Sequence, residues 1–407
     1  MPDPLRVLLL TQWFDPEPTF KGLVFARELV EQGCEVEVIT GFPNYPGGKL
    51  YSGYKVRWLQ REVIDDVNIT RVPLYPSHDN SAVKRVMNYA SFAFSALVYG
   101  VFFARRVDVI YAYHPPLTVG VTASLISWLR GIPFVYDIQD MWPDTLRATG
   151  MIKSGHMLSL IGRVCDWVYR QADHLVVLSP GFVRLLVKRG VPEEKIEVIY
   201  NWANEEALEL NDGSVPTDFP SRDFFRVIFA GNIGRAQALD TVLNAALILK
   251  ERSVGACIVF VGGGLEADQL KARAADLCLD NVLFLPPVPM SKVGAILNEG
   301  DALLVHLRRD PLFETTIPSK TQAYMAVGKP ILMAVEGNAS DLVAQAKCGI
   351  SVLPEDPSAL ADAIEAFTCM SKDELTELGL NGKRFYDEFL SLKVGAKKFV
   401  KTFNKLI

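Results

Sequence analysis

The chain has 407 residues, which exceeds the size at which a single hydrophobic core stops growing, so we expect two domains of roughly 200 residues. Its hydrophobic content of 49% is enough for two cores. The net charge is -5, acidic and basic residues are mixed along the chain, and the lack of a strongly basic patch argues against a nucleic-acid partner.

The cysteines are scattered and form no Cys-x-x-Cys pair. This spacing predicts reduced thiols in a cytosolic chain and no metal site. The sequence also contains no Asp-x-Asp motif and no His, Cys and Asp spacing typical of a cation site, so we expect no metal cofactor. The six cysteines are Cys34, Cys165, Cys257, Cys278, Cys348 and Cys369.

The first apolar run, residues 5–10, is too short for a signal peptide and predicts a first strand. A helix at 22–32 and a strand at 35–40 follow, which is the opening of a doubly wound sheet. Gly22 at the helix start would allow the phosphate of a ligand to approach the backbone at the carboxyl edge of this sheet. No G-x-G-x-x-G follows the strand, which argues against a dinucleotide-binding domain.

Residues 41–54 (GFPNYPGGKLYSGY) form an insertion rich in Pro, Gly and Tyr after the second strand. This composition predicts an ordered loop rather than a flexible one. Because it lies at the edge of the sheet where ligands bind, we expect it to be functional.

Residues 86–104 contain almost no strongly polar side chain except Asn88, and Lys84-Arg85 and Arg105-Arg106 bracket them. Three interpretations compete: a buried helix of the first domain, a helix on a membrane surface, and a transmembrane helix. The length is borderline for a span. A span would also separate the following strand from the first two. We therefore favour the first two interpretations.

His114 ends the next predicted strand, residues 107–113, and Pro115-Pro116 stops it. Doubly wound domains bind ligands at this end of a strand, so we expect His114 to be functional, with a structural histidine as the alternative. Asp140 follows another predicted strand in the stretch IPFVYDIQDMWPD and is a second candidate. Alternating helices and strands then continue to about residue 200.

Residues 208–223 are acidic and rich in Asn, Asp, Pro and Ser without periodicity, which predicts a linker. We expect an amino-terminal domain at 1–205, a linker at 206–223 and a carboxyl-terminal domain at 224–380. A last helix at 381–407 is expected to pack back toward the first domain.

The second half repeats the arrangement of strand, loop and helix. Three loops, at 231–240, 262–264 and 287–290, precede helices and should converge on one sheet edge. One Gly-rich loop can be a simple tight turn, but several together favour a nucleotide-diphosphate site.

The stretch IPSKTQAYMAVGKPI (317–331) adds a charge to this edge. Ser319 is the expected N-cap of a helix that Gly328 ends, and a buried strand precedes it. The free N-H groups of Ser319, Lys320 and Thr321 would face a ligand, and with the lysine they favour a diphosphate. The alternative is a capped surface helix with a solvated lysine.

These residues resemble a family, the retaining family-four glycosyltransferases of the B fold, and within it the WbuB-like N-acetyl-L-fucosamine transferases. The resemblance covers nearly the whole chain. It rests on QWFDPEP, GFPNYPGG, the His114 segment, QDMWPD, VIYNWA, GNIGRAQALD, VGGG and PSK...YMAVGKPI. It implies an α/β fold of two Rossmann-like doubly wound domains facing a cleft, with the sugar nucleotide mostly on the second domain and the acceptor on the first.

The resemblance also implies roles for single residues. Gly22 would approach the donor phosphate, His114 would lie beside the donor sugar, and Arg235 and the helix start at Ser319 would contact the diphosphate. The catalytic candidates are His114 and Asp140. The candidate donor-binding residues are Gly22, Asn232, Arg235, Gln237, Gly262, Gly264, Val288, Glu314, Pro318, Ser319, Lys320 and Thr321.

The chain departs from the family pattern at several of these positions. Many members have Gly-Arg and a later Lys-Gly where this chain has Gly231-Asn232 and Gln237-Ala238, and Arg235 would replace the missing charge. The family has a pair of glutamates that should fall at Thr315 and Ala323, and neither of these residues is a glutamate. Glu314 is adjacent to the first of the two positions.

From the resemblance we expect a transferase that moves a sugar, N-acetyl-L-fucosamine in this subfamily, from a UDP-sugar to a polyprenyl-diphosphate-linked saccharide for O-antigen or capsule synthesis. Catalysis would come from orientation and from stabilisation of the leaving diphosphate, without a metal ion. The protein would be cytoplasmic and peripheral on the inner face of the cytoplasmic membrane. A UDP-sugar 2-epimerase and a non-catalytic sugar-nucleotide-binding subunit are the alternatives.

Overall fold

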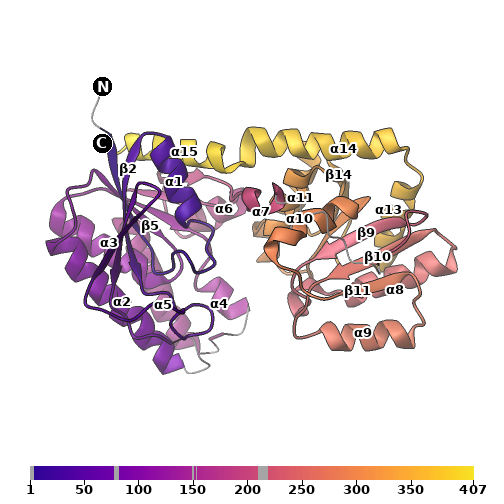
Figure 1. The fold of residues 1–407 in the computed structure, drawn as a ribbon, viewed down its shortest axis with the longest axis horizontal. Helices are drawn as coiled ribbons and strands as arrows, with labels where there is room; N and C mark the ends of the chain where they lie inside the picture. The colour runs from indigo at the N-terminus through magenta and orange to yellow at the C-terminus, as the bar shows by residue number, and fades with distance from the viewer. Residues whose placement is uncertain (1–3, 78–81, 149–150, 153, 210–218) are drawn as a thin grey trace. The chain divides into compact units, whose positions relative to one another are not determined.

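The computed structural model describes residues 4–77, 82–148, 151–152, 154–209 and 219–407. Contacts divide the chain into two compact units (Figure 1). The amino-terminal unit comprises Met1–Tyr200 and Leu392–Ile407, and the carboxyl-terminal unit comprises Asn201–Ser391. Of the expected linker, residues 210–218 lie outside the described residues, and the short helix α7 (Glu205–Glu209) stands at its start.

The sheet of the amino-terminal unit has eight strands in the order β3-β4-β2-β1-β5-β6-β7-β8. All neighbours pair in parallel except β3 and β4, which form an antiparallel hairpin at one edge. Strand β5 is a continuous apolar run, and β1 and β6 are apolar except for Arg6 and Asp137, as expected for parallel strands covered on both faces. The strands are β1 Leu5–Leu10, β2 Cys34–Gly41, β3 Gln60–Ile64, β4 Val67–Val72, β5 Val109–Tyr113, β6 Phe134–Ile138, β7 His174–Val177 and β8 Ile196–Val198.

Helices α2, α3, α5 and α6 pack on one face of this sheet, and α1 and α15 pack on the other (Figure 1). The order of the strands requires this division, because the chain reverses its direction across the sheet after β4. The helices are α1 Leu23–Glu31, α2 Ala82–Phe102, α3 Leu117–Arg130, α4 Asp144–Ala148, α5 Gly155–Gln171, α6 Pro180–Lys188 and α15 Leu392–Asn404.

Helix α2 is the apolar segment with charged ends, and only one side of it is buried. Asn88, Phe92 and Ala96 recur every four residues and face the core. On the other side the side chains of Val86 and Phe94 are 63% and 69% exposed. One side of α2 therefore belongs to the core, and the other side forms an apolar surface. No helix in the described ranges is both long enough and apolar enough to cross a membrane.

Helix α15 completes the amino-terminal unit with residues from the far end of the chain. The ring of Phe399 lies 5.2 Å from the rings of Phe25 and Tyr111. Thr402 Oγ1 donates a hydrogen bond of 2.8 Å to Glu197, and the ammonium of Lys405 lies 3.0 Å from the same carboxylate. Hydrogen bonds from His174 and from these two side chains lower the pKa of Glu197 to about 2.

The sheet of the carboxyl-terminal unit is entirely parallel, with six strands in the order β11-β10-β9-β12-β13-β14. Helices α8 and α13 pack on one face, and α10 and α11 pack on the other. The strands are β9 Phe225–Ala230, β10 Ala256–Val261, β11 Val282–Leu285, β12 Ala302–His306, β13 Ile331–Ala334 and β14 Gly349–Ser351. The helices are α8 Asp240–Glu251, α9 Ala267–Asp276, α10 Met290–Glu299, α11 Ser319–Val327, α12 Asn338–Ala346, α13 Pro357–Thr368 and α14 Lys372–Phe385.

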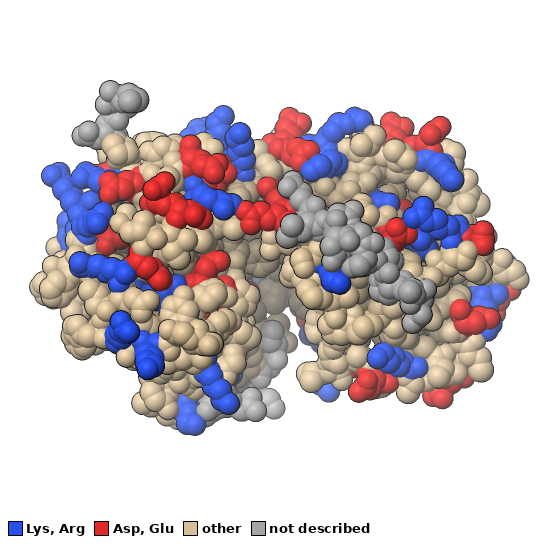
Figure 2. All heavy atoms as spheres, in the orientation of Figure 1, with Lys and Arg blue, Asp and Glu red and all other residues tan. Residues whose placement is uncertain are grey.

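Acidic and basic side chains are interspersed on the face of the molecule that Figure 2 shows. Arg252 of α8 is an example, because its guanidinium lies 2.6 Å from Asp362 and 2.8 Å from Glu365 of α13. Exposed pairs of this kind contribute little to stability. The mixed surface corresponds to the mixed charge along the sequence.

Candidate functional site

The Gly-rich loops of the carboxyl-terminal unit meet at the carboxyl edge of its sheet. A Cβ atom on Gly262 would lie only 2.0 Å from the carbonyl oxygen of Gly231, so the loops after β9 and β10 are in backbone contact. Ile233 N-H also donates a hydrogen bond of 2.8 Å to Gly263 O. Gly262 and Gly264 have φ of 143° and 154°, which an L side chain rarely adopts. Glycine is therefore required by both the space and the backbone conformation.

Lys320 joins these loops at the point where the strand order reverses, between β9 and β12. Its ammonium lies 3.8 Å from the centre of the Phe229 ring, and a Cβ atom on Gly231 would approach its Cε to 2.7 Å. Burial lowers the pKa of Lys320 to about 8. No carboxylate of the described residues lies within ion-pair distance of this ammonium. The site thus holds a partly desolvated cation that an anionic ligand would stabilise.

Helix α11 starts one residue earlier than the sequence suggests. Pro318 is the N-cap, with the extended angles φ -58° and ψ 135°, and the Ser319 side chain makes no capping hydrogen bond. The prediction of Ser319 as N-cap is therefore wrong, because the conformation of the preceding proline already begins the helix at Ser319. Thr321 N-H donates to Pro318 O at 2.8 Å, so the N-H groups of Ser319 and Lys320 are the ones left for a ligand. Gly328 ends the helix at φ 75°, as predicted.

Asn232, Arg235 and Gln237 lie in the loop after β9. Gln237 Oε1 accepts hydrogen bonds from Gly234 N-H at 3.2 Å and from Asn232 Nδ2 at 3.5 Å, so these two side chains shape the loop. The Arg235 side chain is 89% exposed, and its Nε lies 3.5 Å from Glu266. Ala238 has a left-handed φ of 45°, which explains why a glycine stands at this position in the family pattern.

Two further candidates lie in neighbouring loops of the same edge. Glu314 is exposed on a 3-10 turn, and its backbone oxygen accepts a hydrogen bond of 3.2 Å from Asn338 Nδ2. Val288 is half-buried in the loop between β11 and α10. The structure therefore brings Gly262, Gly264, Asn232, Gln237 and Lys320 together and places Glu314 and Val288 in adjoining loops.

His306 is a residue of this edge that the sequence reasoning did not single out. It ends β12 and is almost fully buried, and its Nδ1 lies 2.6 Å from Gln237 O. Glu355 N-H approaches its Nε2 at 3.5 Å, which fits a neutral ring that donates from Nδ1. Burial lowers its pKa. The signal was present, because His306 ends a buried strand as His114 does.

Gly22 lies in the amino-terminal unit at the start of α1, where the side chain of Asp15 occupies the N-terminus of the helix. Asp15 Oδ2 accepts a hydrogen bond of 2.6 Å from Leu23 N-H. A Cβ atom on Gly22 would lie 2.1 Å from the same oxygen. Gly22 thus makes room for the carboxylate of Asp15, which interacts favourably with the positive end of the helix.

His114 is buried at the carboxyl end of β5. Its ring makes edge contacts with Tyr136 and Trp142, at centroid distances of 5.9 Å and 5.2 Å. Burial lowers its pKa to about 3, so the imidazole is neutral at physiological pH. Its Nδ1 is buried without a hydrogen-bond partner among the described residues. Asp140 follows β6, and burial raises the pKa of its carboxyl group.

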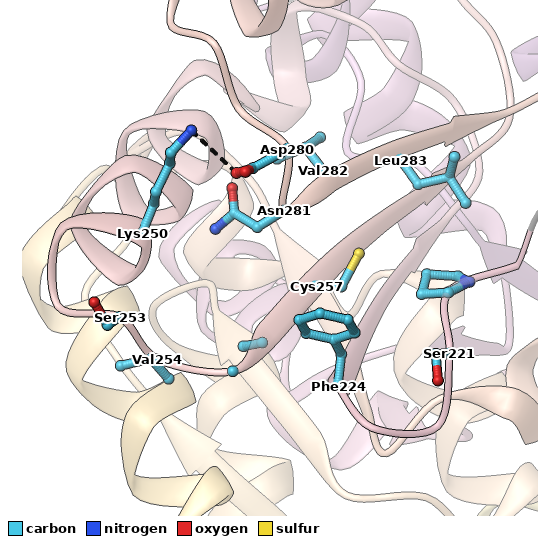
Figure 3. Close-up of a pocket in the computed structure, with 13 residues that line it drawn as sticks. Ser221, Phe224, Lys250, Ser253, Val254, Cys257, Asp280, Asn281, Val282 and Leu283 are labelled. Carbon is cyan, nitrogen blue, oxygen red and sulfur yellow. Dashed lines mark ion pairs between the residues drawn. The ribbon is translucent and has the colours of Figure 1, made fainter.

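A cavity of about 500 Å³ lies on the other edge of the carboxyl-terminal sheet (Figure 3). Phe224, Ala256 and Val282 line it, and they stand at the amino ends of β9, β10 and β11. Lys250 and Asp280 form an ion pair of 3.0 Å beside it. It is therefore separate from the glycine loops and Lys320. No group of three or more His, Cys, Asp or Glu in the described part of the chain could hold a metal ion.

Two family descriptions match the chain. Residues 23–202 match the glycosyl transferase 4-like domain, and residues 219–384 match the glycosyl transferases group 1. The boundary between the two matches falls near the boundary between the two compact units.

Similar proteins of known sequence include two bacterial glycosyltransferases. The probable glycosyltransferase WbjE of Pseudomonas aeruginosa is 28% identical over 305 residues, which cover 71% of this chain and 74% of WbjE. The putative colanic acid biosynthesis glycosyl transferase WcaI of Escherichia coli is 27% identical over 347 residues, which cover 82% of this chain and 84% of WcaI.

Two solved structures show the fold. Sucrose-phosphate synthase from Thermosynechococcus elongatus has a TM-score of 0.72 at 16% identity and covers 99% of both chains. HepE from Anabaena in complex with UDP-glucose has a TM-score of 0.67 at 16% identity, and covers 99% of this chain and 100% of HepE. The predicted α/β fold with two doubly wound domains is confirmed, and the amino-terminal sheet is mixed, because β3 is antiparallel.

Proposed function

Because the chain belongs to the glycosyltransferases with a 4-like amino-terminal domain and a group 1 carboxyl-terminal domain, we propose that it transfers a sugar from a UDP-sugar to a polyprenyl-diphosphate-linked saccharide in the synthesis of a bacterial surface polysaccharide. The similarity to WbjE and WcaI supports a role in polysaccharide synthesis. The similarity to HepE, which binds UDP-glucose, supports UDP as the nucleotide of the donor. N-acetyl-L-fucosamine, transferred with retention, is the sugar we would test first.

One observation carries the proposal: a cation without a carboxylate partner lies beside glycine loops and a helix start. The Lys320 side chain packs against Gly231, whose loop contacts Gly262, and the N-H groups of Ser319 and Lys320 stand in the first turn of the same helix. Oriented donors of this kind bind a diphosphate and stabilise the charge that develops on it when it leaves. The transfer then requires that the acceptor hydroxyl be held close to the anomeric carbon.

The direct test incubates the protein with a panel of nucleotide sugars and with lipid-linked saccharides extracted from bacterial membranes. Transfer of the sugar to the lipid fraction is expected, and it should be faster with UDP-sugars than with other nucleotide sugars. Formation of a C2 epimer without acceptor would instead identify an epimerase. A protein that binds UDP but shows no transfer, no epimerisation and no hydrolysis of the donor would be a non-catalytic subunit.

Arg235→Ala should weaken UDP binding about tenfold in calorimetry, because a charge-assisted contact to the diphosphate is lost. The matched control is Glu266→Gln, which removes the carboxylate 3.5 Å from Arg235 and should leave UDP binding unchanged or slightly stronger. Unchanged affinity in Arg235→Ala would remove Arg235 from the proposed site.

We also propose that the apolar surface of α2 and α3 lies on an anionic membrane. Phe102 of α2 and Trp128 of α3 are 74% and 77% exposed. Arg130 ties the ends of these helices together with hydrogen bonds of 2.9 Å to Gly100 O and 2.8 Å to Arg105 O. Cations flank the surface at both ends of α2, where they would meet lipid phosphates.

Vesicle sedimentation tests this contact. Binding to anionic vesicles should be reversible and should weaken as salt rises, and a change of Lys84 and Arg85 to Ala should weaken it by about 2 kcal/mol, since each cation contributes about 1 kcal/mol. Phe94→Ser should also weaken it, whereas Leu265→Ser, at an exposed apolar residue of the other unit, should not. Retention in the pellet after alkaline carbonate would indicate an integral helix. If the protein does not bind anionic vesicles, the apolar surface of α2 and α3 is not a membrane-binding surface.

A further inference from the structure

A buried carboxylate joins the loops that follow β1 and β2. Glu17 is 2% exposed and accepts three hydrogen bonds from the backbone. The donors are Phe14 N-H at 3.2 Å in its own loop, and Asn44 N-H and Tyr45 N-H, both at 2.7 Å, in the loop after β2. The two loops are thereby fixed to each other at the carboxyl edge of the amino-terminal sheet.

Asn88, the single strongly polar residue in the middle of α2, extends this connection to the helix. Its Oδ1 accepts a hydrogen bond of 2.6 Å from Gln12 Nε2. Its Nδ2 donates to Tyr75 O at 2.7 Å and to Asn44 Oδ1 at 3.3 Å. Gln12, Asn44 and Asn88 are all nearly fully buried. These hydrogen bonds hold the two loops and α2 in one arrangement, and Gln12 Oε1 is the one buried side-chain atom of these three residues without a partner among the described residues.

Three aromatic rings lie next to the network, each on a residue adjacent in sequence to one of its members. Trp13 and Tyr45 stack, with ring centroids 4.5 Å apart and an interplanar angle of 27°. Tyr89 of α2 meets Trp13 edge-on at 6.5 Å. All three residues are only half-buried. Tyr51 donates a hydrogen bond of 2.8 Å to Tyr45 O and so supports the loop from the other side.

We propose that Trp13, Tyr45 and Tyr89 form a platform on which a sugar ring of the acceptor packs, and that Gln12, Glu17, Asn44 and Asn88 are positioning residues that hold this platform. A pyranose ring has an apolar C-H face and a polar rim, which matches half-buried aromatic rings beside a polar network. The platform lies at the sheet edge where doubly wound domains bind ligands. The inference rests on the proposed function in one respect, the saccharide nature of the acceptor.

Binding to the platform can be measured without any transfer reaction. The full chain is labelled with 5-fluorotryptophan, and the Trp13 fluorine signal is assigned from Trp13→Phe. Titration with a panel of soluble disaccharides and trisaccharides should shift the Trp13 signal for at least one of them and leave the signal of Trp58, an 87% exposed residue, in place. If no saccharide shifts the Trp13 signal, the platform is excluded.

Kinetics with the extracted lipid-linked saccharides provide a second test. Trp13→Ala and Tyr45→Ala should raise the acceptor KM at least tenfold and leave the UDP dissociation constant within twofold, whereas Tyr45→Phe, Tyr89→Phe and the control Trp58→Ala should behave like the parent. Asn88→Leu should raise the acceptor KM more than it lowers kcat, which a loss of folded protein would not do. Transfer with an unchanged KM in Trp13→Ala overturns the platform and leaves the function intact. A parent protein that neither binds UDP nor transfers a sugar refutes the function, and the fluorine titration still decides the platform.

Discussion

Lys320→Met should weaken UDP binding at least tenfold at pH 7. The ammonium lies among the glycine loops without a described carboxylate partner, and a charge-assisted contact to a phosphate contributes about 1.5 to 3 kcal/mol. Calorimetry measures the loss. Lys271→Met, at an exposed lysine of α9, is the matched control and should bind UDP as the parent does.

The same lysine should make UDP binding dependent on pH in a defined direction. In the free protein the ammonium loses its proton as the pH rises through about 8. A bound diphosphate favours the charged form and raises this pKa. The contribution of Lys320 to UDP affinity should therefore be full and constant below pH 8, and the affinity should fall above it, by up to about tenfold per pH unit until the pKa of the complex is reached.

The pH dependence distinguishes a lysine that contacts the diphosphate from one that is only part of a capped helix. Lys320→Met should lose it, and calorimetry in buffers of different ionisation enthalpy should show that the parent takes up a proton when it binds UDP at pH 8.5. Equal UDP affinity in the parent and in Lys320→Met would return Lys320 to the alternative of a lysine on a capped helix.

His114→Ala should reduce turnover about a hundredfold and leave the UDP dissociation constant within twofold. The magnitude is that of one catalytic hydrogen-bond donor or acceptor lost at a reacting centre. Donor affinity should be retained because UDP is proposed to bind residues of the carboxyl-terminal unit, whereas His114 belongs to the other unit. Initial rates with saturating donor, together with calorimetry, separate the two effects.

The protonation of His114 gives this experiment a further readout. Since its pKa is about 3, the ring stays neutral from pH 5 to 9, and no step in the pH profile of turnover over that range should disappear in His114→Gln. Because the residue is buried, His114→Gln also serves as the variant that preserves packing, and the exposed His156→Ala is the control. Equal losses of turnover and UDP affinity would assign His114 a structural role.

The strands that the sequence predicted include the buried ones at the centre of each sheet. In β1 and β12 every residue except Arg6 and His306 is apolar, and such a run is typical of a strand covered on both faces. The β3–β4 hairpin was missed for the opposite reason. Its edge strand carries Arg61 and Glu62 at successive positions, and its turn has Asp65 and Asp66 at positive φ in place of the glycine that usually marks a hairpin.

The convergence of the glycine loops was predictable from topology, because parallel strands place their following loops at one edge. The burial of Lys320 was not predictable, since it depends on the Phe229 ring and on the contact with Gly231, almost ninety residues away in sequence. Glu17 and Asn88 illustrate the same limit. Each was visible as a polar residue in an apolar or Pro-rich setting, but their hydrogen-bond partners come from elements that only the fold brings together.

The chain returns to the amino-terminal unit at Leu392, and this affects how the protein folds during synthesis and where it can be divided. Residues 1–200 leave the ribosome long before α15 exists, and until then Phe25, Tyr111 and Glu197 lack the partners that Phe399 and Thr402 supply. The amino-terminal unit can therefore complete its native packing only after translation has passed through the whole of the other unit. A single cut near residue 200 cannot separate the units intact, and a chimera that exchanges the amino-terminal unit must also exchange residues 392–407.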